Sequence, residues 1–303
     1  MTASTTASPR AASVWLALLA LYFVWGSTYL AIRVAVETLP PFLMAGTRFV
    51  VAGAVLYAFA IRRGDRHGDA PTAAGWRAAA IVGAGLLLGG NGGVVWAEQH
   101  VSSGLAALLI SCTPIWMALL GRVFYRESIG PAVLAGLVLG LVGVVLLVGR
   151  VETGGADLVA ALVLLGASLS WAAGSLYART APLPRRGLVA TGMEMLTGGG
   201  LLLVLSVVVG EPARVRAADF TLPAVSAVLY LTVFGSLVAF TAYSWLLTNA
   251  PLSLVSTYAY VNPVVAVLLG WLILDEPLTS RVVVAGAAIV AAVALIASAR
   301  RPR

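Results

Sequence analysis

The chain has 303 residues, of which 60% are hydrophobic and only 10% are charged, and its mean hydropathy is +0.99. Soluble proteins carry about 25% charged residues, so this composition indicates a chain embedded in lipid. The net charge of +7 comes from 19 Arg residues, and in a membrane protein a basic excess reports orientation rather than nucleic-acid binding. The single cysteine, Cys112, excludes an intramolecular disulfide.

Ten apolar segments are long enough to cross a bilayer, which takes about 20 residues in a helix. The polar stretch 1–13 before them reads as a cytoplasmic N-terminal tail, and the longest connection, Arg62 to Gly75, is too short for a soluble domain. The sequence therefore predicts an all-α membrane protein with ten transmembrane helices, near residues 14–34, 42–61, 76–96, 101–121, 129–149, 157–177, 188–209, 223–246, 252–274 and 282–299.

The distribution of Arg predicts which side each loop faces, because cytoplasmic loops are richer in basic residues. With the N-terminus inside, 13 of the 19 Arg residues fall on the cytoplasmic side and five outside, while Arg48 lies within a segment. We therefore predict a multi-pass protein of the cytoplasmic (inner) membrane with both termini in the cytoplasm, including the basic C-terminal residues 300–303.

The stretch Pro114 to Glu127 returns as Pro263 to Glu276, 149 residues later. Similarly, Trp25 and Arg33 correspond to Trp171 and Arg179 at an offset of 146. The repeated unit contains five helices, an odd number, so the second copy must enter the membrane in the opposite direction, as in many secondary transporters. We predict two inverted repeats, residues 14–150 and 151–299.

Several motifs resemble the EamA group of the drug/metabolite transporter superfamily. They are Trp25-Gly-Ser-Thr-Tyr-Leu-Ala-Ile-Arg33, Ala45-Gly-Thr-Arg48-Phe49, Val101-Ser-Ser-Gly-Leu-Ala-Ala-Leu-Leu109, Thr113-Pro114 with Glu127, and Asn262-Pro263 through Asp275-Glu276-Pro277. The resemblance covers residues 14–299 and implies a carrier of small metabolites, often an exporter. It also implies a central cavity surrounded by helices 1, 3, 4, 6, 8 and 9.

Ionisable residues inside a bilayer are costly and are functional candidates by default. Arg48 and Glu194 occupy equivalent positions of the two repeats. They form either a coupling pair or a structural ion pair, and the resemblance favours the structural role because it places helices 2 and 7 outside the cavity. Glu98 is either a proton-linked carboxylate or a solvated charge at a helix end.

Helix 3 contains Asn91 between two pairs of glycines, which indicates either close helix packing or a locally unwound segment facing the cavity. Pro114 and Pro263 predict kinks and free backbone carbonyls four residues upstream. Polar and aromatic side chains gather near these features on helices 1, 3, 4, 6, 8 and 9. The predicted substrate-binding residues are Trp25, Tyr29, Asn91, Thr113, Trp116, Trp171, Ser175, Tyr243, Tyr258 and Asn262.

The sequence contains no P-loop, no Cys/His cluster for a metal and no Ser/His/Asp set. We therefore predict a non-enzymatic transporter without a cofactor, whose partners are the lipid bilayer and a small amino-acid-like or drug-like substrate. Two alternatives remain: an integral-membrane enzyme acting on a lipid or isoprenoid substrate, and a membrane scaffold. The substrate and the oligomeric state do not follow from the sequence.

Overall fold

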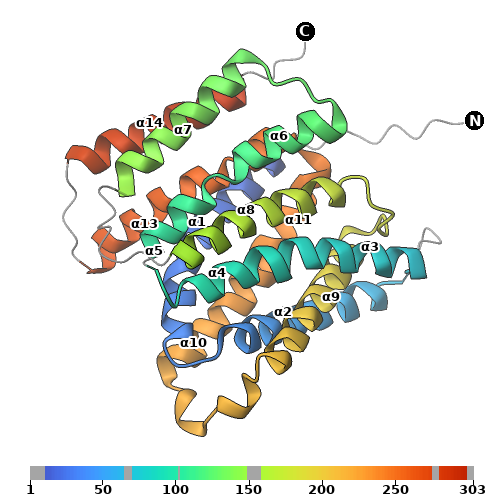
Figure 1. Cartoon of the computed structure of the whole chain (residues 1–303). Helices are drawn as coiled ribbons and strands as arrows, with labels where there is room; N and C mark the ends of the chain where they lie inside the picture. Colours follow the sequence, from blue (N-terminus) through green and yellow to red (C-terminus); the bar gives the residue numbers. More distant parts are fainter. Residues whose placement is uncertain (1–10, 65–69, 102, 149–157, 275–279, 299–303) are drawn as a thin grey trace, which may run out of the picture.

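The computed structural model describes residues 11–64, 70–101, 103–148, 158–274 and 280–298, and every regular element in them is a helix (Figure 1). The predicted all-α class is therefore confirmed. In chain order the elements are α1 (Ala11–Val36), α2 (Pro41–Arg62), α3 (Ala73–Gly83), η1 (Ala84–Asn91), α4 (Gly92–Ala97), α5 (Ser103–Ile110), α6 (Thr113–Tyr125), α7 (Pro131–Val148), α8 (Leu158–Ala178), α9 (Gly187–Val208), η2 (Pro212–Arg214), η3 (Ala217–Asp219), α10 (Leu222–Tyr230), η4 (Leu231–Phe240), α11 (Thr241–Asn249), α12 (Leu252–Val255), α13 (Tyr258–Leu274) and α14 (Ser280–Ser298).

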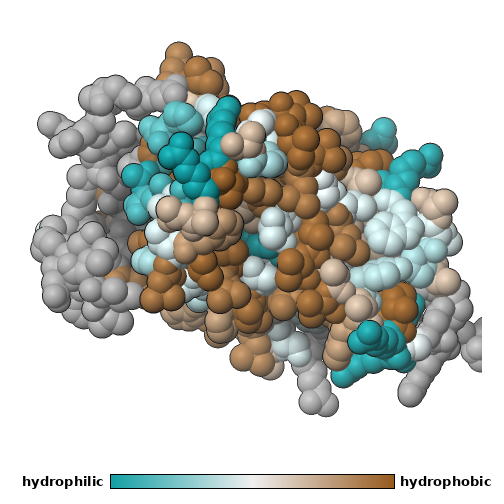
Figure 2. All heavy atoms as spheres, turned by 90° about the horizontal axis from the view of Figure 1, so that it is seen from below, coloured by the Kyte–Doolittle hydropathy of each residue, from teal (hydrophilic) through white to brown (hydrophobic). Residues whose placement is uncertain are grey.

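Six continuous helical stretches among the described residues are long and apolar enough to cross a membrane. Large apolar side chains on their surfaces are exposed, such as Phe23 at 61% and Leu162 at 58%, as expected where lipid is the solvent. Figure 2 shows hydrophobic side chains across the middle of one face, with hydrophilic ones gathered toward its ends. The six stretches are Ala11–Val36, Pro41–Arg62, Ala73–Ala97, Leu158–Ala178, Gly187–Val208 and Leu222–Asn249.

Two of the predicted segments are interrupted. The fourth breaks between α5 and α6, at Ser111 and Cys112, and the ninth breaks between α12 and α13, at Ser256 and Thr257. Pro114 lies in the first turn of α6 rather than at a kink inside a helix. A helix start tolerates proline, because the first N–H groups of a helix have no partner within it. Pro263, in contrast, lies inside α13.

Two other segments contain wide turns at equivalent places. The third span passes through the π-helical segment η1, and the eighth passes through the π-helical segment η4. Around Asn91 the chain therefore stays helical, so the predicted local unwinding is wrong, although Asn91 does face the cavity described below. The flanking glycines allow close packing on α8, because a Cβ on Gly90 would lie 2.7 Å from the Trp171 ring and one on Gly93 2.8 Å from Ala167.

Helices of one half of the chain pack on helices of the other half. Most of these contacts have a counterpart in which the two halves change places. α2 packs on α9, and α7 lies beside α14 (Figure 1). α8 packs on η1 as α1 packs on η4, and α6 contacts α8 as α13 contacts α1. The interior where these pairs meet holds the largest cluster of buried apolar side chains.

Candidate functional site

A cavity of about 80 Å³ lies where the two halves meet. This volume has room for a few water molecules but not for a metabolite. The walls come from α1, α2, η1, α4, α5, α6, α8, η4 and α13. They are lined by Trp25, Thr28, Tyr29, Ile32, Arg48, Phe49, Gly90, Asn91, Val94, Ile110, Thr113, Ala167, Ser168, Trp171, Gly235, Phe240, Tyr258 and Asn262.

Aromatic rings form one wall of this central cavity. The Trp25 ring lies 5.4 Å from Trp171 and 5.0 Å from Tyr258, nearly perpendicular to both. Such edge-to-face contacts stabilise aromatic pairs beyond their buried area. The Trp25 Nε1 also donates to the carbonyl of Gly235, at 3.3 Å. The structure therefore brings together three residues predicted on three different helices.

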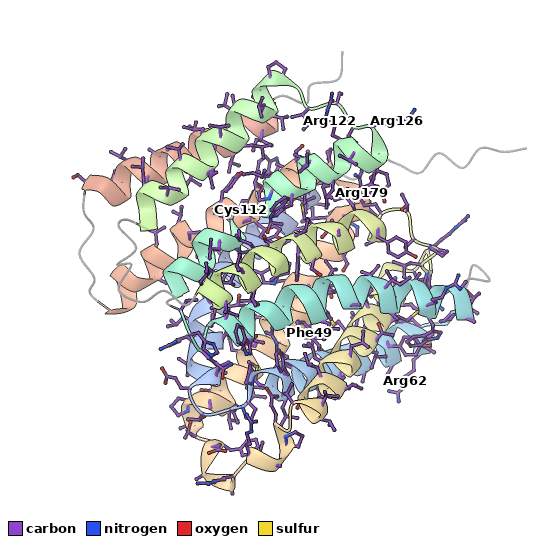
Figure 3. The ribbon with its side chains drawn as sticks, in the orientation of Figure 1. Phe49, Arg62, Cys112, Arg122, Arg126 and Arg179 are labelled. Atoms are coloured by element: carbon purple, nitrogen blue, oxygen red, sulfur yellow. The ribbon has the colours of Figure 1, made fainter. Side chains whose placement is uncertain are left out.

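The polar part of the wall is formed by Arg48 and Asn91. Arg48 is 3% exposed, and its Nη2 donates to Asn91 Oδ1 at 2.9 Å. Its guanidinium carbon also lies 4.4 Å from the centre of the ring of Phe49, a buried residue of α2 that is labelled among the helices of the bundle (Figure 3). The expectation that helix 2 lies outside the cavity is thus wrong, because the Arg48 side chain reaches the wall from α2.

Glu194 does not meet Arg48. It accepts a hydrogen bond from Ser244 Oγ at 3.2 Å and lines a second cavity of about 910 Å³ beside α9 and α11. Among the described residues, neither Arg48 nor Glu194 takes part in an ion pair. The equivalent positions in the two halves therefore serve two separate cavities, and the predicted direct ion pair is not formed here.

Three further predicted residues line the central cavity with different hydrogen bonding. Thr113 Oγ1 donates to the Ile110 carbonyl at 2.6 Å, so it satisfies the carbonyl that Pro114 leaves without a backbone partner. Asn262 is 2% exposed and its Oδ1 has no hydrogen-bond partner. Tyr29 lines the wall from α1. Asn262 therefore presents an unused acceptor.

Trp116, Ser175 and Tyr243 do not line the cavity but support its wall. Trp116 Nε1 donates to Ser168 Oγ at 3.1 Å, and Ser168 is a wall residue. Tyr243 is fully buried, accepts from Trp171 Nε1 at 2.8 Å and bonds Ser175 through its hydroxyl. These residues fix the orientation of the wall.

Glu98 directly follows the third span and is fully buried, so the expectation of a solvated charge is wrong. Neither carboxylate oxygen has a hydrogen-bond partner. Burial raises the pKa of Glu98 well above its usual range, while the guanidinium groups of Arg33 and Arg48 act in the opposite direction. Arg33 Nη1 donates to the Glu98 backbone carbonyl at 2.7 Å, which anchors this turn to α1.

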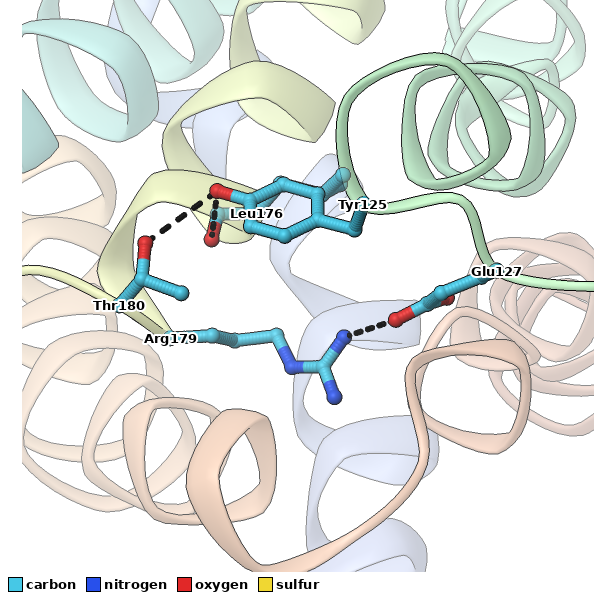
Figure 4. A network of polar contacts seen from close by, with 5 residues as sticks. All are labelled: Tyr125, Glu127, Leu176, Arg179 and Thr180. Atoms are coloured by element: carbon cyan, nitrogen blue, oxygen red, sulfur yellow. Dashed lines mark hydrogen bonds and ion pairs between the residues drawn. The ribbon is translucent and has the colours of Figure 1, made fainter.

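At the other end of the bundle, a polar network joins the end of α6 to the end of α8 (Figure 4). Arg179 Nη1 lies 2.8 Å from Glu127 Oε1. Tyr125 donates its hydroxyl to the Leu176 carbonyl at 3.2 Å and contacts the Thr180 hydroxyl at 3.2 Å. Arg62, Arg122, Arg126 and Arg179 all lie toward this end (Figure 3).

The other wall residues were missed in the sequence because most are small or apolar and resemble ordinary helix-packing residues. Only the hydroxyls of Thr28 and Ser168 carried a polar signal, and both fall one helical turn from a predicted site residue. The missed residues are Thr28, Ile32, Phe49, Val94, Ile110, Ala167, Ser168, Gly235 and Phe240.

A multi-pass helical membrane protein whose two halves enclose an aromatic cavity has the architecture of a membrane transporter. The chain belongs to the EamA-like transporter family, whose sequence model matches it twice, over residues 12–149 and 158–298. The resemblance seen in the motifs is therefore confirmed.

Individual relatives agree with this assignment. YedA, an uncharacterized inner membrane transporter of Escherichia coli K12, is 40% identical over 284 residues, which is 92% of this chain and 89% of YedA. The WAT1-related chloroplastic protein At3g02690 of Arabidopsis thaliana is 29% identical, over 93% of this chain and 69% of that protein. A protein crystal structure with 23% identity shares the fold at a TM-score of 0.75, over 94% of this chain and 96% of the other.

Proposed function

We propose that this protein is a secondary transporter that binds a small, partly polar metabolite in the central cavity and exposes it alternately to the two sides of the membrane. The carrying observation is the cavity itself, whose walls come from both matched halves of the chain. A pocket shared by two rigid halves opens to one side or the other when the halves tilt relative to each other.

The proposed architecture is ten transmembrane helices in two inverted five-helix repeats. It is supported by helix contacts that recur with the two halves changing places, such as the contact of α8 with η1 and that of α1 with η4. It is also supported by the positions of the π-helical segments and of the two helix breaks, which recur in both halves. The positions of Asp275 and Glu276, which extend the repeat motif, lie outside the described residues.

For substrate contact we propose the predicted residues that line the cavity, with Trp116, Ser175 and Tyr243 as supports behind the wall. Glu98 is the proposed coupling carboxylate, because it is buried without a partner. The lining residues concerned are Trp25, Tyr29, Asn91, Thr113, Trp171, Tyr258 and Asn262.

The proposed location is the cytoplasmic membrane with both termini inside. This is supported by the Arg residues that gather toward one end of the bundle (Figure 3) and by the inner-membrane description of YedA. Net export is the proposed direction, which rests on the family resemblance.

The test is a ligand screen by thermal unfolding of the purified full-length protein, followed by counterflow in proteoliposomes. A ligand that binds only the folded state raises the unfolding temperature. We expect at least one metabolite to stabilise the protein and to exchange across the vesicle membrane. Stabilising ligands that never cross the membrane would contradict the transport function.

The alternative of a lipid-modifying enzyme lacks a supporting observation. Such an enzyme needs acidic or histidine side chains that converge on one substrate, whereas Glu98 and Glu194 have different surroundings and no group of three His, Cys, Asp or Glu residues converges within the described ranges.

A further inference from the structure

The Arg48 guanidinium forms no ion pair within the described part of the chain, and the buried carboxyl group of Glu98, which acts on it electrostatically, does not line the central cavity. Within the described part of the chain, the ion pairs are Arg33 with Glu37 and Arg179 with Glu127. Among the described residues, the side-chain acceptor bonded to Arg48 is the neutral amide oxygen of Asn91, and the buried Nε of Arg48 has no hydrogen-bond partner there. It is also the single charged residue among the described residues of the wall.

A charge in this position is costly until an anion joins it. Burying an unpaired charge in an apolar environment is unfavourable, and a paired, hydrogen-bonded anion offsets the desolvation. Asn91 and the Phe49 ring hold the guanidinium in place without neutralising it. The planar guanidinium offers parallel N–H donors that match a carboxylate, and the unpartnered Nε is one of them.

The remaining walls fit an apolar body with one hydrogen-bond donor. Trp25, Trp171 and Tyr258 provide ring surfaces, and the free Oδ1 of Asn262 accepts a hydrogen bond. A cationic ligand finds no carboxylate on these walls and is repelled by Arg48.

We infer that the cavity selects small organic anions, with a carboxylate on Arg48 and an apolar ring against Trp25, Trp171 and Tyr258. The inference rests on the proposed function of the cavity as the substrate site and narrows its substrate class. A dry cavity that holds benzene measures about 150 Å³, so at about 80 Å³ this cavity must widen when a ring enters.

The test compares four probes that share a phenyl ring and chain but differ in charge: 3-phenylpropionate, its neutral amide, 3-phenylpropylamine and zwitterionic phenylalanine. Binding to the full-length protein in lipid nanodiscs is measured by calorimetry at neutral pH. A charge-assisted bidentate contact predicts that the propionate binds at least about tenfold more tightly than the amide, with the amine weakest.

Three variants assign the preference to Arg48. In Arg48→Gln the propionate-to-amide affinity ratio is expected to fall to about one, and Arg48→Lys is expected to keep part of it because the charge remains. Arg214→Gln, which makes the same change in net charge at the end of the 3₁₀ segment η2, is the control and is expected to keep the wild-type ratio.

Equal binding of propionate and amide by the wild-type protein, tighter binding of the amine, no binding of any probe, or an unchanged ratio in Arg48→Gln would each overturn the inference. If phenylalanine alone binds, the ammonium group is required and the simple anion class is also overturned. Counterflow of the same probes separates the two proposals. Transport of the probes without a charge preference would support the transport function and contradict the anion site. Anion-selective binding without transport would support the anion site and contradict the transport function.

Discussion

Arg179, directly after α8, and Glu127, after α6, form an ion pair of 2.8 Å that links the two halves of the chain at one end of the bundle. The side chains are 30% and 43% exposed, so the pair contributes at most about 1 kcal/mol to folding. Its position, rather than its strength, makes it important. A small free energy is enough to shift the balance between open and closed states several-fold.

We therefore expect Glu127→Gln to open this end of the bundle more often while leaving the unfolding temperature nearly unchanged. Ser256, which is 1% exposed and lines a cavity together with this ion pair, is the reporter position. The reporter is a thiol introduced by Ser256→Cys in a Cys112→Ser background. When Glu127→Gln is added to this protein, the thiol should react with a soluble maleimide severalfold faster than it does with Glu127 present. The charge-exchanged double variant Glu127→Arg with Arg179→Glu should restore the slow rate, and a rate that stays high there would contradict the gating role of the pair.

Asn91→Leu removes the acceptor that holds Arg48. A hydrogen bond to a charged group contributes about 1.5–3 kcal/mol, so substrate affinity and transport should fall by about tenfold or more. Gln99→Leu, which changes an exposed amide just after the third span, is the matched control. The measurement is counterflow in proteoliposomes, normalised to folded protein by size-exclusion chromatography. Wild-type transport by Asn91→Leu would remove Asn91 from the cavity's function.

Glu98 predicts a specific dependence of stability on pH. Its pKa in the folded state is raised by burial, whereas in the unfolded chain it is about 4.3. Between these values the folded state binds more protons, so the free energy of unfolding falls as pH rises from about 4.3 up to the raised pKa. The charged groups that act on this carboxylate are Arg33 from α1 and Arg48 from α2.

Glu98→Gln should flatten this part of the profile and raise the unfolding temperature at neutral pH. Glu37→Gln, an exposed carboxylate beside Arg33, is the control and should keep the wild-type slope. Thermal unfolding in nanodiscs across this pH range gives the answer, and a Glu98→Gln profile parallel to that of the wild type would contradict it. If Glu98→Gln also leaves transport and its pH dependence unchanged, the coupling role of Glu98 is excluded.

Gly83 marks a place where two helices touch through their backbones. A Cβ there would lie 2.7 Å from the Gly198 nitrogen and 2.8 Å from the Glu194 carbonyl oxygen, both backbone atoms of α9. Gly83→Ala should therefore destabilise the protein by about 1–3 kcal/mol through overpacking. Gly166→Ala on α8, where nothing lies within 4 Å, should be neutral or slightly stabilising. Unfolding midpoints of the two variants decide the matter, and equal values would count against close packing at Gly83.

The apolar pattern was enough to predict the helical class, because hydropathy alone reports which segments lipid can surround. The direction in which side chains point was harder to predict. Arg48 and Glu194 share a position in the repeat, yet Arg48 reaches the central cavity and Glu194 a second one. Glu98 lies near a predicted helix end, where solvent is the usual surrounding, but tertiary packing covers it completely. Neither the sequence motifs nor the position of a residue along a predicted helix indicates which cavity a side chain reaches or whether packing covers it.

The wide turns of η1 and η4 have a mechanical consequence. A π-helical turn holds about one residue more than an α-helical turn, and one residue corresponds to about 100° of rotation around an α-helix. If η1 tightened into an α-helix, the side chains on one side of it would rotate relative to the other, and Asn91 would leave Arg48. The spans Ala73–Ala97 and Leu222–Asn249 can therefore rotate about their own axes. Such a rotation would take apart the proposed binding wall without moving either end of the helix far across the membrane.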